Sequence, residues 1–263
     1  MSLSSEVLVH IHRAALCVEE RLRGPLSVHD MADAAGLSLF HFSRVFNTAV
    51  CHSPYDYLVR RRLSVAAREV LYASRSITDI ALDYGFHTPE GFARAFRRMF
   101  NALPSTVRKT KSIDERRFVD PVTLGDLGTL ARTEHFKPSL AALPDREVHG
   151  YADRCSNAGF TDNPVFGTDI IVVDYPPDWR EKGPQILYGI SEGASDLTCS
   201  LRTTLAAGNY ARFCSISAGE VLECFLRYLF STFWPRVGSP NLPDRLHFRR
   251  EDRHTWHAYV PVP

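Results

Sequence analysis

Residues 77–100 read ITDIALDYGFHTPEGFARAFRRMF. The stretch opens with apolar residues at helical spacing, breaks at Gly85, and continues as a second helical pattern that carries Arg94, Arg97 and Arg98. A glycine at such a break indicates the end of a helix, because glycine adopts the positive φ that strains other residues. The pattern therefore predicts two short helices joined by a tight turn, with positive charge gathered on the second helix.

The same pattern occurs earlier in the chain, where residues 27–46 read SVHDMADAAGLSLFHFSRVF. In both copies a serine precedes the first helix, a glycine ends it, and two phenylalanines lie one turn apart on the second helix. The matching positions are Ser27/Ser76, Val28/Ile77, Asp30/Asp79, Met31/Ile80, Ala32/Ala81, Gly36/Gly85, Leu37/Phe86, Ser38/Thr88, Phe42/Phe92, Arg44/Arg94, Phe46/Phe96 and Pro54/Pro104. Such a pair of helices is a helix-turn-helix, whose second helix normally enters the major groove of DNA. One copy would equally suit a plain helical hairpin, whereas two copies with equivalent arginines favour DNA binding.

A single long helix is predicted between the two copies, over residues 54–74 (PYDYLVRRRLSVAAREVLYAS). The segment has no internal glycine or proline, Pro54 suits the first helical turn, and the apolar residues follow one stripe. Upstream, residues 5–23 have an amphipathic pattern that Gly24 and Pro25 end. Together these segments predict an all-α double helix-turn-helix domain of about seven helices.

The length and the charge distribution indicate two domains with different partners. A chain of 263 residues exceeds one typical domain, and 44% hydrophobic with 23% charged residues is ordinary for a globular protein. Residues 1–112 hold 15 Lys and Arg against 10 Asp and Glu, whereas the remainder holds 16 against 20. We therefore expect a double helix-turn-helix domain for a polyanion over residues 1–112, a linker over 113–143 and a second domain over 144–263.

The second domain has the pattern of an α+β fold with an antiparallel sheet. Short apolar runs predict strands at residues 148–153, 169–174, 185–191, 201–205, 209–215, 245–248 and 254–260. One long helix is predicted over residues 217–234 (SAGEVLECFLRYLFSTFW), which begins with the capping pair Ser217 and Glu220. Its apolar face is expected to pack on the sheet. Residues 120–143 are expected to be irregular.

Several classes of protein are disfavoured by what the sequence lacks. The N-terminus has no basic segment followed by an apolar core, and no apolar run approaches about 18 residues, so neither a signal peptide nor a membrane span is expected. A cytoplasmic, nucleoid-associated location is therefore expected. The cysteines at positions 17, 51, 155, 199, 214 and 224 form no CxxC motif and have no Cys/His spacing that is typical of a metal site. Reduced thiols are therefore expected, with no metal and no cofactor. The chain is not expected to be an enzyme, because the sequence has no nucleophile-base motif.

Residues 5–110 resemble the DNA-binding domain of the AraC/XylS family of bacterial transcription regulators. The resemblance rests on the two helix-turn-helix copies, the long helix between them, the stretch GFHTPEGFARAFRRMF, and the proline eight residues after Phe96. Cys51 and Asn101 depart from the family pattern, which usually has glycine at these places. Asparagine tolerates the left-handed conformation and cysteine does not, so the turn over residues 51–54 is expected to differ locally.

The family resemblance implies which residues contact DNA. By family position, base contacts fall on Phe40, Ser43, Arg44, Pro89, Glu90, Ala93 and Arg94. Contacts with the DNA backbone are expected in addition from Ser38, His41, Asn47, Thr88, Arg97, Arg98, Arg108 and Lys109. The chemistry agrees, since arginine pairs with guanine, glutamate accepts from cytosine and phenylalanine packs on the thymine methyl group. The alternative for Phe40 is a core aromatic, and for each arginine it is a solvated surface charge. The implied partner is an asymmetric double-stranded site of about two helical turns.

Residues 203–263 resemble the gyrase-inhibitor-like effector-binding domain, which has two related strand-helix-strand-strand halves around a ligand cleft. Family members carry an acidic residue in the strand after the long helix, where this chain reads RLHFRRE, so Leu246 or His247 occupies that place. The resemblance therefore does not support a cationic ligand. A small-molecule site would be lined by Tyr151, Tyr188, Trp234, His247, Trp256 and Tyr259, with core packing as the alternative for each aromatic residue.

The sequence thus predicts a bacterial transcription regulator, expected to be an activator, with an N-terminal DNA reader and a C-terminal sensor of a small molecule. RNA polymerase is the expected protein partner. Two alternatives remain for the C-terminal domain: a ligand-free protein-docking module, or a small-molecule hydrolase. A hydrolase would need a carboxylate in the cleft, and none stands at the expected position.

Overall fold

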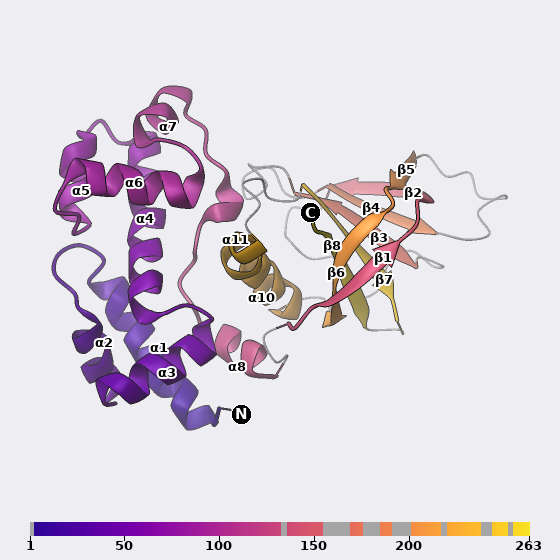
Figure 1. The fold of residues 1–263 in the computed structure, drawn as a ribbon. Helices are drawn as coiled ribbons and strands as arrows, with labels where there is room; N and C mark the ends of the chain where they lie inside the picture. The colour runs from indigo at the N-terminus through magenta and orange to yellow at the C-terminus, as the bar shows by residue number, and fades with distance from the viewer. Residues whose placement is uncertain are drawn as a thin grey trace. The chain divides into compact units, whose positions relative to one another are not determined.

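The computed structural model describes residues 3–132, 136–154, 169–175, 185–190, 201–216, 220–237, 244–251 and 255–263. The chain separates into two compact units, Met1–Arg132 and Thr133–Pro263. The described part of the first unit is helical, and that of the second is built around a sheet (Figure 1). The boundary between the units lies inside the region expected to be a linker.

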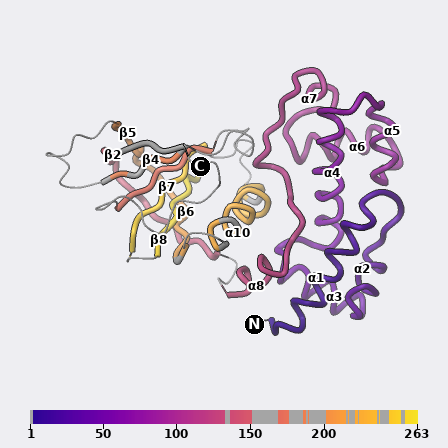
Figure 2. Tube along the Cα trace, turned by 180° about the vertical axis from the view of Figure 1, so that it is seen from behind, coloured from indigo at the N-terminus to yellow at the C-terminus, as the bar shows by residue number. Residues whose placement is uncertain are grey.

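The N-terminal unit consists of helices joined by short turns. Its described elements are α1 (Ser5–Glu20), α2 (Val28–Ala35), α3 (Leu39–Val50), α4 (Pro54–Tyr72), α5 (Ile77–Asp83), α6 (Pro89–Phe100), α7 (Pro104–Thr110), the 3-10 helix η1 (Glu115–Arg117) and α8 (Leu124–Arg132). Helices α2 and α3 form the first helix-turn-helix motif, and α5 and α6 form the second. Helix α3 lies near one end of α4 and α6 lies near the other end (Figures 1 and 2).

Capping residues set the boundaries of each motif. The side chains of Ser27 and Ser76 accept hydrogen bonds from backbone N–H groups three residues on, at 3.2 and 3.0 Å, and so begin α2 and α5. Gly36 and Gly85 follow these helices with φ values of 66° and 75°. Because a side chain is strained in this left-handed region, glycine allows the chain to turn sharply into the second helix of each motif.

The two glycines differ in their surroundings, which predicts unequal costs of substitution. A Cβ atom at Gly36 would meet no atom within 4 Å, whereas at Gly85 it would lie 2.6 Å from Nη1 of Arg62. Gly36→Ala is expected to lower the free energy of unfolding by about 1 kcal/mol through backbone strain. Gly85→Ala is expected to lower it by about 1–3 kcal/mol more, because a buried arginine must also move. Urea unfolding of both variants measures the difference, and equal losses would contradict the close packing of Arg62.

The turn after α3 has the same backbone geometry as the turn after α6. Cys51 ends α3 with a φ of 62°, and Asn101 ends α6 with a φ of 55°. Each donates its N–H to the carbonyl oxygen four residues earlier. The expectation of a local difference at Cys51 was therefore wrong. Surrounding packing holds this cysteine in a conformation that costs an L-residue about 1–2 kcal/mol.

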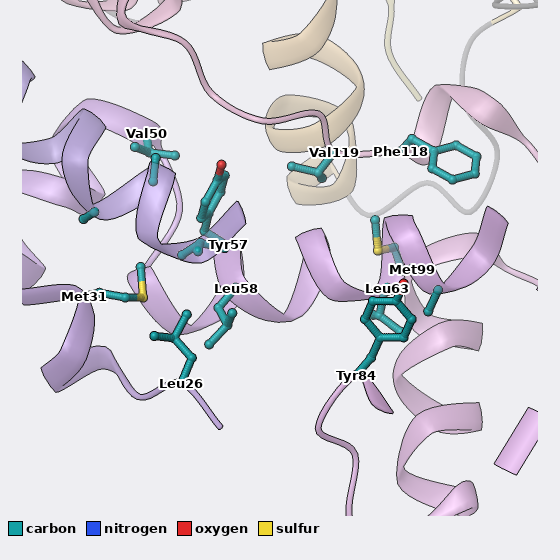
Figure 3. Close-up of a cluster of buried hydrophobic side chains, with 14 of the residues drawn as sticks. Leu26, Met31, Val50, Tyr57, Leu58, Leu63, Tyr84, Met99, Phe118 and Val119 are labelled. Atoms are coloured by element: carbon teal, nitrogen blue, oxygen red, sulfur yellow. The ribbon is translucent and has the colours of Figure 1, made fainter. Parts of the chain in front are cut away.

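The core of the N-terminal unit follows α4, a helix of 19 residues. Figure 3 shows Leu26 beside Leu58 toward one end of α4, with Tyr84 and Met99 beside Leu63 toward the other. All five side chains are buried. At a rise of about 1.5 Å per residue, α4 is about 28 Å long. One helix therefore packs against both motifs and separates them by a fixed length.

A second connection joins the motifs without using the length of α4. The N–H of Gly24, in the α1–α2 turn, donates to the carbonyl oxygen of Asp83, at the end of α5, at 3.1 Å. The Nη2 atom of Arg62 donates to the carbonyl oxygen of Gly24 at 2.6 Å. The hydroxyl of Tyr84 also donates to Oε1 of Glu69 on α4, at 2.7 Å. The two motifs are therefore joined both through α4 and through the hydrogen bond between Gly24 and Asp83.

The segment after α7 packs on the N-terminal unit instead of extending from it. The N–H of Val119 donates to Oγ of Ser64 at 2.9 Å, and the N–H of Val122 donates to the hydroxyl of Tyr57 at 3.1 Å. Helix α8 then lies against α1 and α3. This segment was expected to be irregular, because two glycines within α8 lower its intrinsic helix propensity. Tertiary packing stabilises the helix instead.

The described strands of the C-terminal unit form one antiparallel sheet. They are β1 (Ser139–Leu143), β2 (Arg146–Arg154), β3 (Ile170–Asp174), β4 (Gln185–Ile190), β5 (Leu201–Leu205), β6 (Gly208–Ile216), β7 (Arg245–Arg250) and β8 (Trp256–Pro261). Their order across the sheet is β1-β6-β8-β7-β3-β4-β2-β5. All but β1 overlap the predicted strands, and β1 lies in the segment expected to be irregular.

A helical segment covers one face of this sheet (Figure 2). Its elements are α10 (Glu220–Tyr228), the π-helical η3 (Leu229–Phe233) and α11 (Trp234–Val237). The ring of Phe225 on α10 lies 5.1 Å from that of Phe213 on β6 and 6.4 Å from that of Phe248 on β7, centroid to centroid. The helix expected over residues 217–234 is therefore present and packs on the sheet, while its predicted cap Ser217 lies outside the described residues.

Candidate functional site

Helix α3 presents one face to solvent and the other to the core. Phe42 and Phe46 are fully buried, with ring centroids 5.2 Å apart. Phe40, by contrast, is 80% exposed, so it is not a core residue. Arg44 is also exposed, and Ser43 beside it is half-buried. The outer face thus offers an aromatic ring, a hydroxyl and a guanidinium, which are groups that contact base edges in the major groove.

Helix α6 has the same division into faces. Phe92 and Phe96 are buried, with ring centroids 5.5 Å apart. Glu90 and Arg94 are exposed, and Ala93 between them is half-buried. Because residues three and four apart lie on one side of a helix, these three positions form a single outer face. The two motifs therefore carry an exposed arginine at equivalent positions of their outer faces.

The other predicted contact residues on these helices surround the two faces. Ser38 and Thr88 are exposed N-cap residues whose hydroxyls accept hydrogen bonds from the N–H groups of His41 and Gly91. The remaining exposed positions are Asn47, Pro89, Arg97 and Arg98, and His41 is half-buried. Each helix N-terminus carries partial positive charge. Ser38 and Thr88 at these N-termini are therefore placed where a phosphate would be stabilised. Arg97 and Arg98, in the last turn of α6, offer a phosphate their guanidinium charge instead.

The arginines of the two faces are not neutralised within the described part of the chain. No described carboxylate forms an ion pair with Arg44, Arg94, Arg97 or Arg98. Exposed guanidinium groups without an internal partner retain all of their donors for a ligand. They are suited to bidentate pairing with guanine or with phosphate oxygens.

The basic residues of α7 and its C-terminal end have different surroundings. Arg108 is half-buried, and its Nε donates to the carbonyl oxygen of Val70 at 3.3 Å. Lys111 likewise donates to the carbonyl oxygen of Leu71. Both therefore satisfy carbonyl groups at the C-terminus of α4, where positive charge is stabilising. Lys109 is exposed and points to no such carbonyl in the described chain.

Comparison with known proteins places these helices in a family. A helix-turn-helix domain model matches residues 31–110. Regulatory protein SoxS of Escherichia coli K12 is 36% identical over 91 residues, which cover 35% of this chain and 85% of SoxS. The chain belongs to the AraC/XylS family. Transcriptional regulator Rob of Salmonella typhimurium is 31% identical over 144 residues, or 49% of each chain, so the chain spans about half the length of Rob.

Among solved structures, an AraC-type transcriptional regulator from Chromobacterium violaceum is 28% identical, and the match covers 39% of this chain and 92% of that chain with a TM-score of 0.38. The residues matched by the family model include both α3 and α6. This AraC/XylS-family chain thus carries the family's helix-turn-helix domain, and the two outer helix faces of that domain are the candidate DNA interface.

The C-terminal unit of this AraC/XylS-family regulator contains an aromatic cluster on the sheet. His247 and Tyr259 lie directly opposite each other on β7 and β8, and their rings stack at 5.0 Å with an interplanar angle of 3°. The ring of Tyr210 meets His247 edge-on at 5.1 Å. Side chains alternate along a strand, and Phe248 contacts α10. His247 therefore lies on the face away from α10, whereas Leu246 shares the face of Phe248.

Trp256 and Trp234, which were also predicted to contact a ligand, do not join this cluster. Trp256 lies on the α10 side of β8, by the same alternation, and Trp234 is buried in α11. The side chains of Tyr151 and Tyr188 lie outside the described residues, although their backbones pair in β2 and β4. The predicted ligand site combined residues from both faces of the sheet. The sequence alone does not show which face each side chain occupies, because this depends on how the strands pair.

His247 is held in a neutral form. Burial, together with the positive charges of Arg249 and Arg146, lowers the pKa of His247 from 6.5 to about 3. Its Nε2 atom is buried and finds no hydrogen-bond partner among the described residues. The guanidinium of Arg249 lies 5.0 Å from the ring centroid of Tyr259. The sequence analysis did not predict that either arginine lies near His247. For Arg249 a signal was available, because residues two apart on a strand share one face of the sheet.

The lowered pKa predicts that stability depends on pH. In the unfolded chain histidine titrates near 6.5, so the stabilisation from neutral His247 is complete above that pH and is lost as the pH falls toward about 3. His247→Phe keeps an aromatic ring and should therefore flatten the fall in unfolding free energy between about pH 7 and pH 5. Urea titrations at each pH measure this. His149→Phe on β2 is the matched control, and equal flattening by both variants would contradict the assignment.

No group of three or more His, Cys, Asp or Glu side chains in the described segments is placed to hold a metal ion. None of the described helices is both long and apolar enough to cross a bilayer.

Proposed function

We propose that the chain binds an asymmetric double-stranded DNA site, with α3 and α6 in successive major grooves. The observation that carries this proposal is the repeated outer face, with exposed Arg44 and Arg94 at equivalent places on helices near the two ends of α4. Successive major-groove turns on one side of DNA are about 34 Å apart, which is comparable to the length of about 28 Å for α4. One chain supplies both reading helices, so dimerisation is not required.

Base readout would rest on different chemistry at each position. Arg44 and Arg94 would donate in bidentate fashion to O6 and N7 of guanine. Phe40 would pack on a thymine methyl group and Ser43 would bond a base edge. Glu90 would accept from N4 of cytosine and, by repelling phosphate, would also penalise incorrect docking. The two remaining proposed base contacts, Pro89 and Ala93, are small enough to allow close approach of the helix.

Backbone contacts would fix the register of the protein on DNA without choosing the sequence. The proposed contacts are Ser38, His41, Asn47, Thr88, Arg97, Arg98 and Lys109. Arg108 was predicted to belong to this set, but its bond to Val70 favours a structural role in fixing α7 on α4. Lys109 is then the proposed phosphate contact from α7.

For the C-terminal unit, we propose that it senses a small molecule on the face that carries His247, Tyr259 and Tyr210. A buried polar atom without a partner is costly, and a ligand that hydrogen-bonds Nε2 of His247 would relieve that cost. A ligand that binds one of two arrangements more tightly would shift the population between them. The DNA reader would thereby be presented differently to the promoter or to RNA polymerase, and the proposed outcome is activation.

Selection of bound sequences from a random duplex pool by the intact chain, at about 150 mM salt, tests the reading mode. The expected result is an asymmetric site with two short blocks one helical turn apart. A palindromic site would contradict reading by a single chain. Binding without enrichment of any sequence would contradict base readout and leave phosphate contacts alone.

Lys109→Ala is expected to weaken binding to specific and random duplexes alike. Removal of one phosphate contact should lower the slope of log K against log salt concentration by about one unit, because one fewer counterion is released. Fluorescence anisotropy over a range of salt concentrations measures this slope. Arg13→Ala removes an exposed charge from α1 and is the control whose slope should not change. An unchanged slope for Lys109→Ala would remove this residue from the interface.

A further inference from the structure

A cleft of about 680 Å³ lies in the N-terminal unit beside α6. Its lining includes Val59 and Arg62 from α4, Phe86 from the α5–α6 turn, and Ala95 and Arg98 from α6. The lining residues of α6, which include Ala95 and Arg98, lie on the side of that helix next to the outer face described above. The volume falls within the range of about 300–1,000 Å³ that is usual for small-molecule sites, and the mixture of apolar walls with a few polar groups is also typical.

Arg62, which lines this cleft, is a buried cation, with only 8% of its surface exposed. Its Nη2 donates to the carbonyl oxygen of Gly24, and its Nη1 occupies the space that the missing side chain of Gly85 leaves. Its Nε is buried without a hydrogen-bond partner among the described residues. Burial lowers the pKa of Arg62. No described carboxylate forms an ion pair with it.

Other buried arginines of the same unit are neutralised. Arg61 and Arg116 each pair with a carboxylate, at 2.7 and 2.9 Å. The cleft does contain Asp56, but this carboxylate pairs with Arg60 at 2.7 Å. Burying a guanidinium without a counter-ion costs several kcal/mol in general. An anion in the cleft would supply the counter-charge that Arg62 lacks.

We propose that this cleft binds a small amphipathic anion, a carboxylate or a phosphate ester with an apolar group. The charged end would pair with Arg62 at the cleft wall and with the exposed Arg98. The apolar end would pack on Val59, Phe86 and Ala95. The cavity and the uncompensated buried cation are independent observations, and both fit this one class of ligand.

Occupancy of the cleft is expected to oppose DNA binding. Thr88 and Arg98 line the cleft and also belong to the proposed phosphate contacts. An anion held by Arg98 removes this charge from the DNA backbone, and by reciprocity DNA lowers the affinity for the anion by the same factor. This coupling rests on the proposed DNA contacts, whereas binding of the anion does not. The N-terminal unit would then carry an inhibitory site of its own.

Calorimetric titration of the intact chain tests the proposal, with hexanoate and phenyl phosphate as probes and with hexanol and benzyl alcohol as uncharged controls. At constant ionic strength, both anions are expected to bind and the alcohols to bind at least about tenfold more weakly. Arg62→Gln removes the charge, and Ala95→Phe fills the cleft. Each should weaken binding of the anions at least about tenfold. Ala34→Phe, at a half-buried position of α2 outside the cleft, is the matched control and should bind as the parent chain does.

The possible outcomes separate the cleft from other sites. Absence of binding, or equal binding of the alcohols, would overturn the proposal. Undiminished binding by Ala95→Phe would place the anion elsewhere in the chain and would overturn it also. If Arg62→Gln does not fold by circular dichroism, Ala95→Phe alone decides. A different outcome would be that neither probe binds the parent chain, while Arg62→Gln lowers the slope of log K for DNA against log salt concentration. The counter-ion of Arg62 would then be a DNA phosphate, and the small-molecule assignment would be overturned.

Discussion

The double variant Arg44→Ala/Arg94→Ala is expected to lose about 2–6 kcal/mol of binding free energy on its specific DNA site. Each bidentate arginine contact contributes about 1–3 kcal/mol of discrimination. The two losses should add, because the residues lie on separate motifs and share no partner in the described chain. The corresponding fall in affinity is roughly 30-fold to more than 10⁴-fold. Anisotropy titrations with the selected site and with random duplexes measure this loss.

Discrimination, rather than affinity alone, decides the role of the two arginines. On random duplexes the same variant should lose much less, because non-specific binding depends on phosphate contacts. Each single variant should also relax the choice of one base, in one block only. The variant Arg13→Ala removes an exposed charge from α1 and should leave both affinities nearly unchanged. Equal losses on specific and random DNA would reassign Arg44 and Arg94 to the phosphate backbone.

Phe96→Ala is expected to lower the free energy of unfolding of the N-terminal unit by about 3–5 kcal/mol. Phe96 is fully buried, and its ring centroid lies 5.5 Å from that of Phe92 and 4.7 Å from that of Phe100. Truncation would remove the aromatic contacts and leave a cavity behind the DNA-facing surface of α6. Because typical domains have only about 5–15 kcal/mol of stability, this loss is a large fraction of the total. Urea unfolding followed by circular dichroism measures the loss.

Phe40→Ala is the matched control for that prediction. It makes the same chemical change on the other reading helix, at a side chain that is 80% exposed. The free energy of unfolding should change by less than about 0.5 kcal/mol. Its effect should appear on DNA instead, as a loss of preference for thymine at one position. A large loss of stability in Phe40→Ala would show that the exposed ring is structural after all.

The helical half of the fold was predictable because its sequence contains the same motif twice. A glycine at the end of a short helix, such as Gly36 or Gly85, indicates a residue with positive φ. Two phenylalanines at helical spacing indicate the face of a helix that is buried. The repeat therefore fixed both the elements and the faces that they bury. The conformation of Cys51 was not predictable, because an intrinsic preference against positive φ can be outweighed by packing around a single turn.

Other elements were missed because their stability comes from distant contacts. Helix α8 contains two glycines and packs on α1 and α3. Strand β1 is a run of small and aliphatic residues that pairs with β6, some seventy positions further along the chain. Neither segment has a strong local signal. In both cases the partner surface, which a local pattern does not contain, determines the structure.

The candidate site was predictable in its location and less so in its members. Exposed residues such as Arg44 and Arg94 follow from helical periodicity once the buried phenylalanines are known. Arg108 had the right charge and the right neighbourhood, yet it bonds the end of α4. The role of Arg62 was not predicted, because it belongs to a run of three arginines. The sequence does not show that these three residues differ in burial and in their ion pairs. Charge can be read from a sequence, but the pairing of charges cannot.

Under the proposed reading of two successive major grooves, the double connection between the motifs, through α4 and through the contact of Gly24 with Asp83, would also constrain the DNA sites that the chain could bind. A protein that holds its two recognition helices at a fixed separation cannot bind a DNA site whose two halves are rotated relative to each other about the duplex axis. One base pair inserted between the halves would rotate the second by about 34° around the duplex, and five would turn it to the far side. Point mutations would thus weaken a promoter gradually, whereas a single insertion or deletion between its halves would silence it in one step.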